Sequence, residues 1–322
     1  MKRKRNAGVF VISLDFELFW GVADIADIAQ WENDIKKVYD IVPRTLDLFE
    51  KYGIHATWAT VAGIMLDDYK ELLQYLPEDL PEQTHEIISK FNFSDELKSI
   101  PDYMLFGNKL VQLVKNAEGQ EIGTHTFTHY YCDKKDSNIK DFLYEMDTAS
   151  LIMKKKGYGE CNSVVFPRNQ VSECYVHVLP QNIYAFRGSI PGYIDKLKKK
   201  NRRLGTLVWY LDHYLPLQNS AYSLNEIKKG KKYDIKLSRL FKAYKEKYRF
   251  AEKMKIWRYK KEMEYAAKKG KVYHICWHPH NFSRCTDRNF EQLEDLLIKF
   301  KVLEEKYGMV SMNMDELRRY LN

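Results

Sequence analysis

Two histidines four residues apart are the clearest chemical signal in this chain of 322 residues. They lie in the run Glu121-Ile-Gly-Thr-His-Thr-Phe-Thr-His129, which follows an apolar, strand-like stretch. If the chain turns helical after Gly123, His125 and His129 lie one turn apart on one face, where neutral imidazoles bind a divalent ion such as Zn²⁺. We interpret the pair as two ligands of a metal site, against the alternative of two unrelated surface histidines.

A catalytic zinc site usually takes a third protein ligand and keeps one position open for water. The β-rich run from Val9 to Glu17 ends in two acids, Asp15 and Glu17, and a side-chain period of two points both to the same side. Carboxylates at the C-terminal end of a strand lie where α/β barrels place catalytic groups. Either acid is therefore a candidate third ligand, and an exposed acid pair in a hairpin is the alternative.

The run from Glu121 to His129 resembles the metal-binding motif of the polysaccharide deacetylases, the NodB-homology fold of carbohydrate esterase family four. In that family the first motif usually ends in two adjacent aspartates, a general base and then a metal ligand. Phe16 occupies the second position here, so the resemblance implies Asp15 as the base and Glu17 as the ligand, and the reverse assignment stays open. Further motifs follow in the family's order: Ala-Thr-Trp at 56–58, Phe-Pro-Arg at 166–168 and His-Pro at 278–279.

Three further site residues follow from the resemblance. Arg168 matches the arginine that orients the catalytic base, and Arg187 is its rival. Asp212, near Trp209, matches an aspartate that supports the motif histidine. His278, before Pro279, matches the general acid at the end of the last catalytic strand; the alternative is a second metal site built from three histidines, His274, His278 and His280.

The resemblance implies an irregular β/α barrel in one domain, residues 1–322, and the chain's 45% hydrophobic content is enough for a large core. Apolar periodicity predicts a helix at 34–52, and further helices are expected at about 136–156 and 289–307. Buried strands are expected near 53–63 and 309–313. Residues 65–118 are interpreted as a helical insertion beside the site, and residues at about 218–270 as a basic one.

The basic insertion is unusually charged. Residues 228–271 hold eighteen Lys and Arg against five acids, whereas the whole chain has a net charge of +8. Aromatic residues alternate with these cations. A solvated helix is one interpretation, and a surface for an anionic ligand or a membrane interface is the other.

The N-terminus lacks the features of a secretory signal, no window is apolar enough to cross a bilayer, and the five cysteines are scattered. We therefore expect a cytoplasmic protein with reduced thiols.

The expected activity is metal-dependent hydrolysis, with Zn²⁺ the expected ion, of an acetyl group from a sugar. N-acetyl is favoured over O-acetyl, and the sugar is free, nucleotide-linked or lipid-linked. Contact with an anionic membrane is a further expectation, and nucleic acid is not an expected partner. The alternatives are a glycoside hydrolase on a related barrel and a non-catalytic glycan- or anion-binding protein.

Overall fold

The computed structural model describes residues 7–24, 28–77, 79–90, 100–189, 200, 201, 203, 204, 208 and 219–322. The predicted site residue Asp212 and its neighbour Trp209 lie outside these residues. The strands are β1 (Val9–Phe16), β2 (Ala56–Thr60), β3 (Gln120–Thr124), β4 (Ser163–Val164), β5 (Ala185–Phe186), β6 (Tyr222–Ser223), β7 (Lys228–Lys229), β8 (Lys232–Asp234), β9 (Arg239–Leu240), β10 (Lys271–Trp277) and β11 (Val310–Ser311). The helices are α1 (Ile28–Tyr52), α2 (Tyr69–Leu73), α3 (Glu82–Lys90), α4 (Asp102–Leu105), α5 (Asn108–Asn116), α6 (Ile139–Lys155), α7 (Glu173–His177), α10 (Arg249–Lys269), α11 (Thr286–Tyr307) and α12 (Met314–Tyr320).

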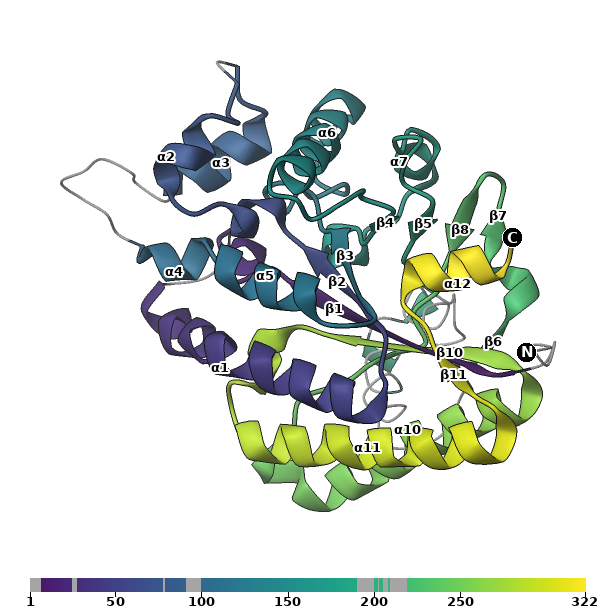
Figure 1. Cartoon of the computed structure of the whole chain (residues 1–322). Helices are drawn as coiled ribbons and strands as arrows, with labels where there is room; N and C mark the ends of the chain where they lie inside the picture. The colour runs from purple at the N-terminus through teal and green to yellow at the C-terminus, as the bar shows by residue number, and fades with distance from the viewer. Residues whose placement is uncertain are drawn as a thin grey trace.

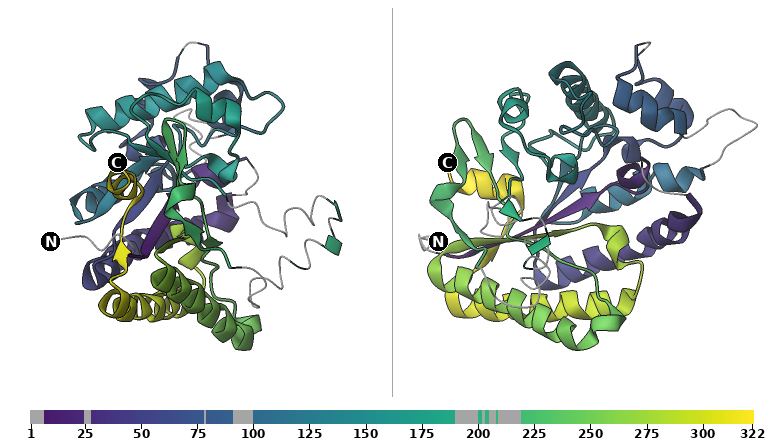
Figure 2. Two further views of the ribbon diagram at one scale, coloured as in Figure 1. Left: turned by 90° about the vertical axis from the view of Figure 1, so that its right-hand side faces the viewer. Right: turned by 180° about the vertical axis from the view of Figure 1, so that it is seen from behind.

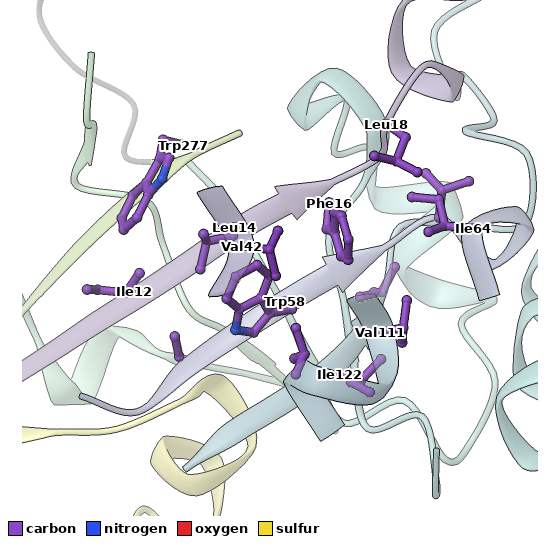
Figure 3. Close-up of a cluster of buried hydrophobic side chains, with 14 of the residues drawn as sticks. Ile12, Leu14, Phe16, Leu18, Val42, Trp58, Ile64, Val111, Ile122 and Trp277 are labelled. Atoms are coloured by element: carbon purple, nitrogen blue, oxygen red, sulfur yellow. The ribbon is translucent and has the colours of Figure 1, made fainter. Parts of the chain in front are cut away.

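Strand β1 lies between β2 and β10, and all three run parallel (Figure 1). Successive side chains of β1 point to opposite faces of the sheet. Ile12, Leu14 and Phe16 pack among buried side chains that include Trp58 and Trp277 (Figure 3). Val9 and Val11 belong to a separate buried cluster on the other face. Because the period is two, Ser13 and Asp15 share that second face, and Asp15 lies near the strand's C-terminal end.

The sheet is curved, and within the described residues its strand order is β6-β10-β1-β2-β3-β4-β5-β8-β7, with β11 beside β1 and β9 beside β10. The segment 232–240 pairs with β5 through β8 at its start and with β10 through β9 at its end. It therefore links the two sides of the curved sheet. The irregular β/α barrel predicted above is confirmed, and this part of the predicted basic insertion belongs to the barrel sheet.

Helices α1, α10 and α11 lie along one side of the sheet, with α11 in contact with both others (Figure 1). The helix predicted at 34–52 begins earlier, at Ile28. Helix α6 starts where Asn138 accepts a hydrogen bond from the Asp141 backbone N–H, a standard N-terminal cap. The described part of 65–118 contains α2 to α5. Among the described residues, none of the helices combines the length and the apolar content needed to cross a membrane.

Candidate active site

The loop that carries the two histidines is not a helix, so the predicted one-turn spacing is wrong. After β3 the chain turns sharply, with left-handed backbone at Thr126 (φ 65°) and His129 (φ 68°). The backbone N–H of His125 donates to the Thr60 carbonyl at the end of β2, and the Thr126 carbonyl accepts from Ala62. These bonds to the neighbouring strand end bring both imidazoles to the C-terminal edge of the sheet.

Glu17 faces both histidines. Its Oε2 lies 3.0 Å from His129 Nε2 and 3.4 Å from His125 Nε2, and all three side chains are almost fully buried. The Nδ1 of His125 lies 2.7 Å from the Val165 carbonyl, which can only accept, so Nδ1 carries the proton and Nε2 presents a lone pair. Burial lowers the pKa of His129, more than Glu17 raises it, and favours its neutral form.

These three side chains fit a divalent metal ion. Glu17 Oε2 and His125 Nε2 are buried and have no hydrogen-bond partner, and His129 Nε2 lies 3.0 Å from the same Glu17 oxygen. An unpartnered buried polar atom is costly unless something else satisfies it. One carboxylate and two neutral imidazoles are also a donor set typical of zinc. The three residues form a group whose candidate ligand atoms lie within 4.8 Å of one another.

Asp15 lies beside this group and is held by Arg187, not by Arg168. The Arg187 guanidinium donates to both carboxylate oxygens of Asp15, at 2.5 and 2.7 Å, and both side chains are buried. Burial alone would raise the pKa of Asp15, but the positive charges of Arg187 and His278 outweigh it and lower the pKa to about 2. Asp15 is therefore ionised and fixed in orientation.

The prediction that Arg168 holds Asp15 is wrong. Arg168 has left-handed backbone (φ 53°) after Pro167, is exposed, and donates to Asp24 while its guanidinium lies 4.2 Å from the centre of the Tyr131 ring. Arg187 follows β5, whose neighbour in the sheet is β4, and so reaches the interior of the barrel. Strands β5 and β1 are not neighbours in the sheet, so Arg187 meets Asp15 across the inside of the curved sheet. No local sequence pattern distinguished Arg187 from Arg168.

A buried network behind Asp15 was missed by the sequence analysis. Ser13 Oγ accepts from Arg187 at 3.0 Å and lies 2.8 Å from His274 Nε2, while Asn169 accepts from Arg187 Nε. Burial and the nearby Arg187 charge lower the pKa of His274 to about 3, so it is neutral. Ser13 could have been found, because it lies two residues before Asp15 on the same strand face.

His278 lies at the open side of the site. Its Nε2 is 3.1 Å from Glu17 Oε1 and 3.7 Å from Asp15 Oδ2, and its side chain is partly exposed. Burial opposes the imidazolium, but the two carboxylates outweigh burial and raise the pKa to about 9. The alternative site of three histidines does not form, because His274 is bonded to Ser13; the second group of candidate ligands in the described residues is Glu17, His278 and His280.

Glu145 on α6 holds the loop that carries His125 and His129 through hydrogen bonds to its backbone. The sequence analysis did not identify this residue. Its carboxylate accepts from the backbone N–H groups of Phe127 and Thr128, at 2.9 and 2.7 Å. The hydroxyls of Thr128 and Thr84 donate to its other oxygen. Burial raises the pKa of Glu145, and its effect exceeds that of these hydrogen bonds, which lower the pKa. No signal in the sequence marks an acid on the buried face of a helix as a partner for a distant loop.

We expect Glu145→Leu to lower the free energy of unfolding by about 2–4 kcal/mol, because it leaves two buried backbone donors without acceptors. Glu145→Gln should cost less, since its amide oxygen can accept from both N–H groups and its amide nitrogen can donate to the hydroxyls. Urea unfolding of both variants measures this. Asp147→Ala, at an exposed position of the same helix, is the control and should change little. Equal unfolding midpoints for Glu145→Leu and the control would contradict the supporting role.

No protein-family model and no curated protein matches the sequence. Solved structures do match the fold. A Mycobacterium smegmatis protein described as a polysaccharide deacetylase aligns with 100% of this chain and 92% of its own, with a TM-score of 0.59 and 9% identity. A Pseudomonas aeruginosa PAO1 protein, also described as a polysaccharide deacetylase, aligns with 98% of this chain and 91% of its own (TM-score 0.52, 11% identity). The chain has the polysaccharide deacetylase fold.

The polysaccharide deacetylase fold is shared with other enzymes. A GH57-type branching enzyme from Pyrococcus horikoshii aligns with 99% of this chain and 71% of its own, with a TM-score of 0.53 and 11% identity. Because one fold can carry several chemistries, the likeness establishes the architecture, and the activity has to be argued from the site residues.

Proposed function

We propose that this protein is a hydrolase that removes an acetyl group from a sugar, most directly the N-acetyl group of an amino sugar. One observation carries the proposal. Glu17, His125 and His129 meet in a buried donor set with unpartnered atoms, next to an ionised Asp15 and a His278 with a raised pKa. A metal position, a base and a proton donor are the groups that hydrolysis of an amide requires.

We propose Glu17, His125 and His129 as the ligands of a divalent ion, with Zn²⁺ the expected metal. The ion would polarise the acetyl carbonyl and activate a water molecule. Asp15, held by Arg187, accepts the proton of the attacking water. His278 donates its proton to the sugar nitrogen as the C–N bond breaks, so acetate and the free amine leave.

The site favours a deacetylase over a glycoside hydrolase. A glycoside hydrolase needs one carboxylic acid with a raised pKa to protonate the leaving oxygen. Burial would raise the pKa of Asp15 and Glu17, but neighbouring cations outweigh it in both, to about 2 in Asp15 and to well below the usual range in Glu17. Neither acid is suited to donate a proton, whereas His278 is.

The finer features of the proposal follow the sequence analysis. The proposed substrate is an acetylated sugar attached to a nucleotide or a lipid, and the proposed place of action is the cytoplasm. O-acetyl groups are the second choice, because the proton donor matters more for an amine than for an alcohol leaving group.

Acetate release from a panel of acetylated sugars tests the function. The protein, loaded with Zn²⁺, is incubated with N-acetylated and O-acetylated sugars, free, nucleotide-linked and lipid-linked, and products are identified by mass spectrometry. We expect loss of an acetyl group from at least one N-acetylated sugar, and no loss with Glu17→Ala. New reducing ends without acetate would indicate a glycoside hydrolase, and binding without turnover would indicate a binding protein.

A further inference from the structure

Helix α10 buries several charged side chains and exposes large aromatic ones, which is unusual for a helix on a protein surface. Its inward face buries four charged side chains, Glu252, Lys255, Arg258 and Glu262. They are paired with one another or with Arg239 and the Lys242 carbonyl. Its outward face exposes Phe250 at 79% and Trp257 at 50%. Large aromatic side chains are normally the ones a helix buries, so their exposure calls for a partner.

The exposed aromatic residues of α10 lie among cations. We define the outer face of α10 as a set of exposed apolar and basic residues that extends from just before the helix to its middle: Lys245, Lys247, Tyr248, Arg249, Phe250, Lys253, Met254, Trp257 and Lys261. In the described part of the chain, none of these five cations has an ion-pair partner. The two acids between Lys245 and Trp257 are Glu246, which is exposed, and Glu252, which is buried against Lys255.

A hollow of about 600 Å³ lies beside this face, between the first turns of α10 and α11. Tyr244, Phe250 and Trp257 line it from the α10 side. The acids of α11 that border it are paired: Asp295 with Lys260 at 2.5 Å, and Glu291 with Arg288 at 2.8 Å. The hollow therefore adds no unbalanced negative charge to the outer face. The right-hand view of Figure 2 shows the green α10 lying along the surface in front of the yellow-green α11.

The outer face begins at the same edge of the sheet as the active site. Strand β9 runs parallel to β10, with Leu240 opposite Cys276, and the chain leaves the barrel there toward α10. On β10, His278 follows directly after the same edge. The Tyr244 backbone N–H donates to Asn289 at 2.6 Å, which fixes the approach of α10 to the first turn of α11. The start of the outer face therefore lies near the edge of the sheet that carries His278.

We propose that the outer face of α10 docks on an anionic lipid membrane and that the acetylated sugar is carried by a lipid in that membrane. Exposed Trp and Phe beside unpaired Lys and Arg are the composition that binds a bilayer interface: the rings enter the headgroup region and the cations attract anionic lipids. The lipid carrier rests on the proposed deacetylase function, whereas the docking does not. A nucleic acid would need cations spaced along a groove, and here the large apolar side chains of Phe250 and Trp257 are exposed among the cations.

Vesicle flotation tests the docking with the full chain. We expect the protein to float with vesicles of phosphatidylcholine mixed with phosphatidylglycerol and to stay in the dense fraction with phosphatidylcholine alone. Binding should weaken as salt rises, because the attraction is screened beyond about 8 Å at physiological ionic strength. Phe250→Ser with Trp257→Ser, and separately Lys245→Ser with Lys247→Ser and Lys253→Ser, should each reduce the floated fraction by about tenfold or more.

The matched control is Leu151→Ser with Lys154→Ser, which removes an exposed apolar residue and an exposed cation from α6. It should float like the unmodified protein, and thermal unfolding should show that all variants are folded. The proposal is overturned if the protein floats equally with neutral and anionic vesicles. It is also overturned if both sets of variants bind anionic vesicles as fully as the parent protein. A change in sedimentation mass on loss of Phe250 and Trp257, without flotation of the parent protein, would show that the face joins two copies and would also overturn it.

Activity separates this proposal from the proposed function. On a soluble N-acetylated amino sugar the outer-face variants should have unchanged turnover, because they do not touch the site. On the same sugar linked to a lipid in anionic vesicles, their turnover should fall by about tenfold. If the protein floats with anionic vesicles but deacetylates none of the sugars, the docking proposal stands and the proposed deacetylase function is wrong. If the variants and the parent protein have equal turnover on the vesicle-bound sugar, the proposal that a lipid carries the substrate is wrong.

Discussion

Glu17→Ala should yield protein without its divalent ion, whereas Asp15→Asn should keep the ion and lose turnover. Glu17 Oε2 is the carboxylate oxygen that faces His125 and His129, so its removal takes away one of the three proposed ligands. Asp15 is directed instead at Arg187, and the loss of a general base reduces turnover by about 10²–10⁴-fold. Elemental analysis of chelator-free protein and acetate release measure the two effects.

Asp15→Asn also leaves Arg187 without its ionic partner, so turnover has to be expressed per folded, metal-loaded protein. Thermal unfolding followed alongside metal content provides this correction. If Asp15→Asn lost the ion and Glu17→Ala kept it, the two acids would have the reverse roles. His278→Ala should keep the ion as well and lose the most turnover on substrates with a poor amine leaving group.

The second large effect concerns the buried ion pair between Arg187 and Asp15. Arg187→Met should lower the free energy of unfolding by about 3–5 kcal/mol, because it leaves a buried carboxylate without its partner. Arg168→Met is the matched control. Its guanidinium is exposed and pairs with Asp24 at the surface, so the change should be about 1 kcal/mol or less. Urea unfolding of both variants gives the comparison.

The stability lost in Arg187→Met should depend on pH. The pKa of Asp15 is depressed in the folded protein, to about 2 from the ordinary 3.8. The pair therefore contributes fully above the ordinary pKa, and its contribution falls as the pH drops through about 2. The difference between wild type and Arg187→Met should shrink over that range. Similar losses for Arg187→Met and Arg168→Met at neutral pH would mean that Arg187 does not hold Asp15.

The sequence by itself determined the parts of the site that depend on local periodicity. The alternation of β1 predicted Asp15 and Glu17 on one side of the strand, and the residue types of the His125 and His129 pair indicated a metal site. Apolar periodicity located α1 except for its first six residues, and the helices expected at about 136–156 and 289–307 match α6 and α11 to within three residues. Strands and helices can be predicted in this way because a strand repeats every two residues and a helix every 3.6, whereas the loop through His125 and His129 follows neither period.

Tertiary structure decided which distant residues meet. Arg168 and Arg187 both follow strands, and only the pairing of β4 with β5 and the turn after Pro167 sent one inward and the other to the surface. The turn through His125 and His129 is fixed by Glu145, sixteen residues beyond His129, and by the ends of β2. Glu262 on the inner face of α10 is satisfied by hydrogen bonds from Arg239 and Tyr273, which belong to the sheet. Residue type and spacing along one segment hold no information about such contacts, because they form only when separate strands come together in the sheet.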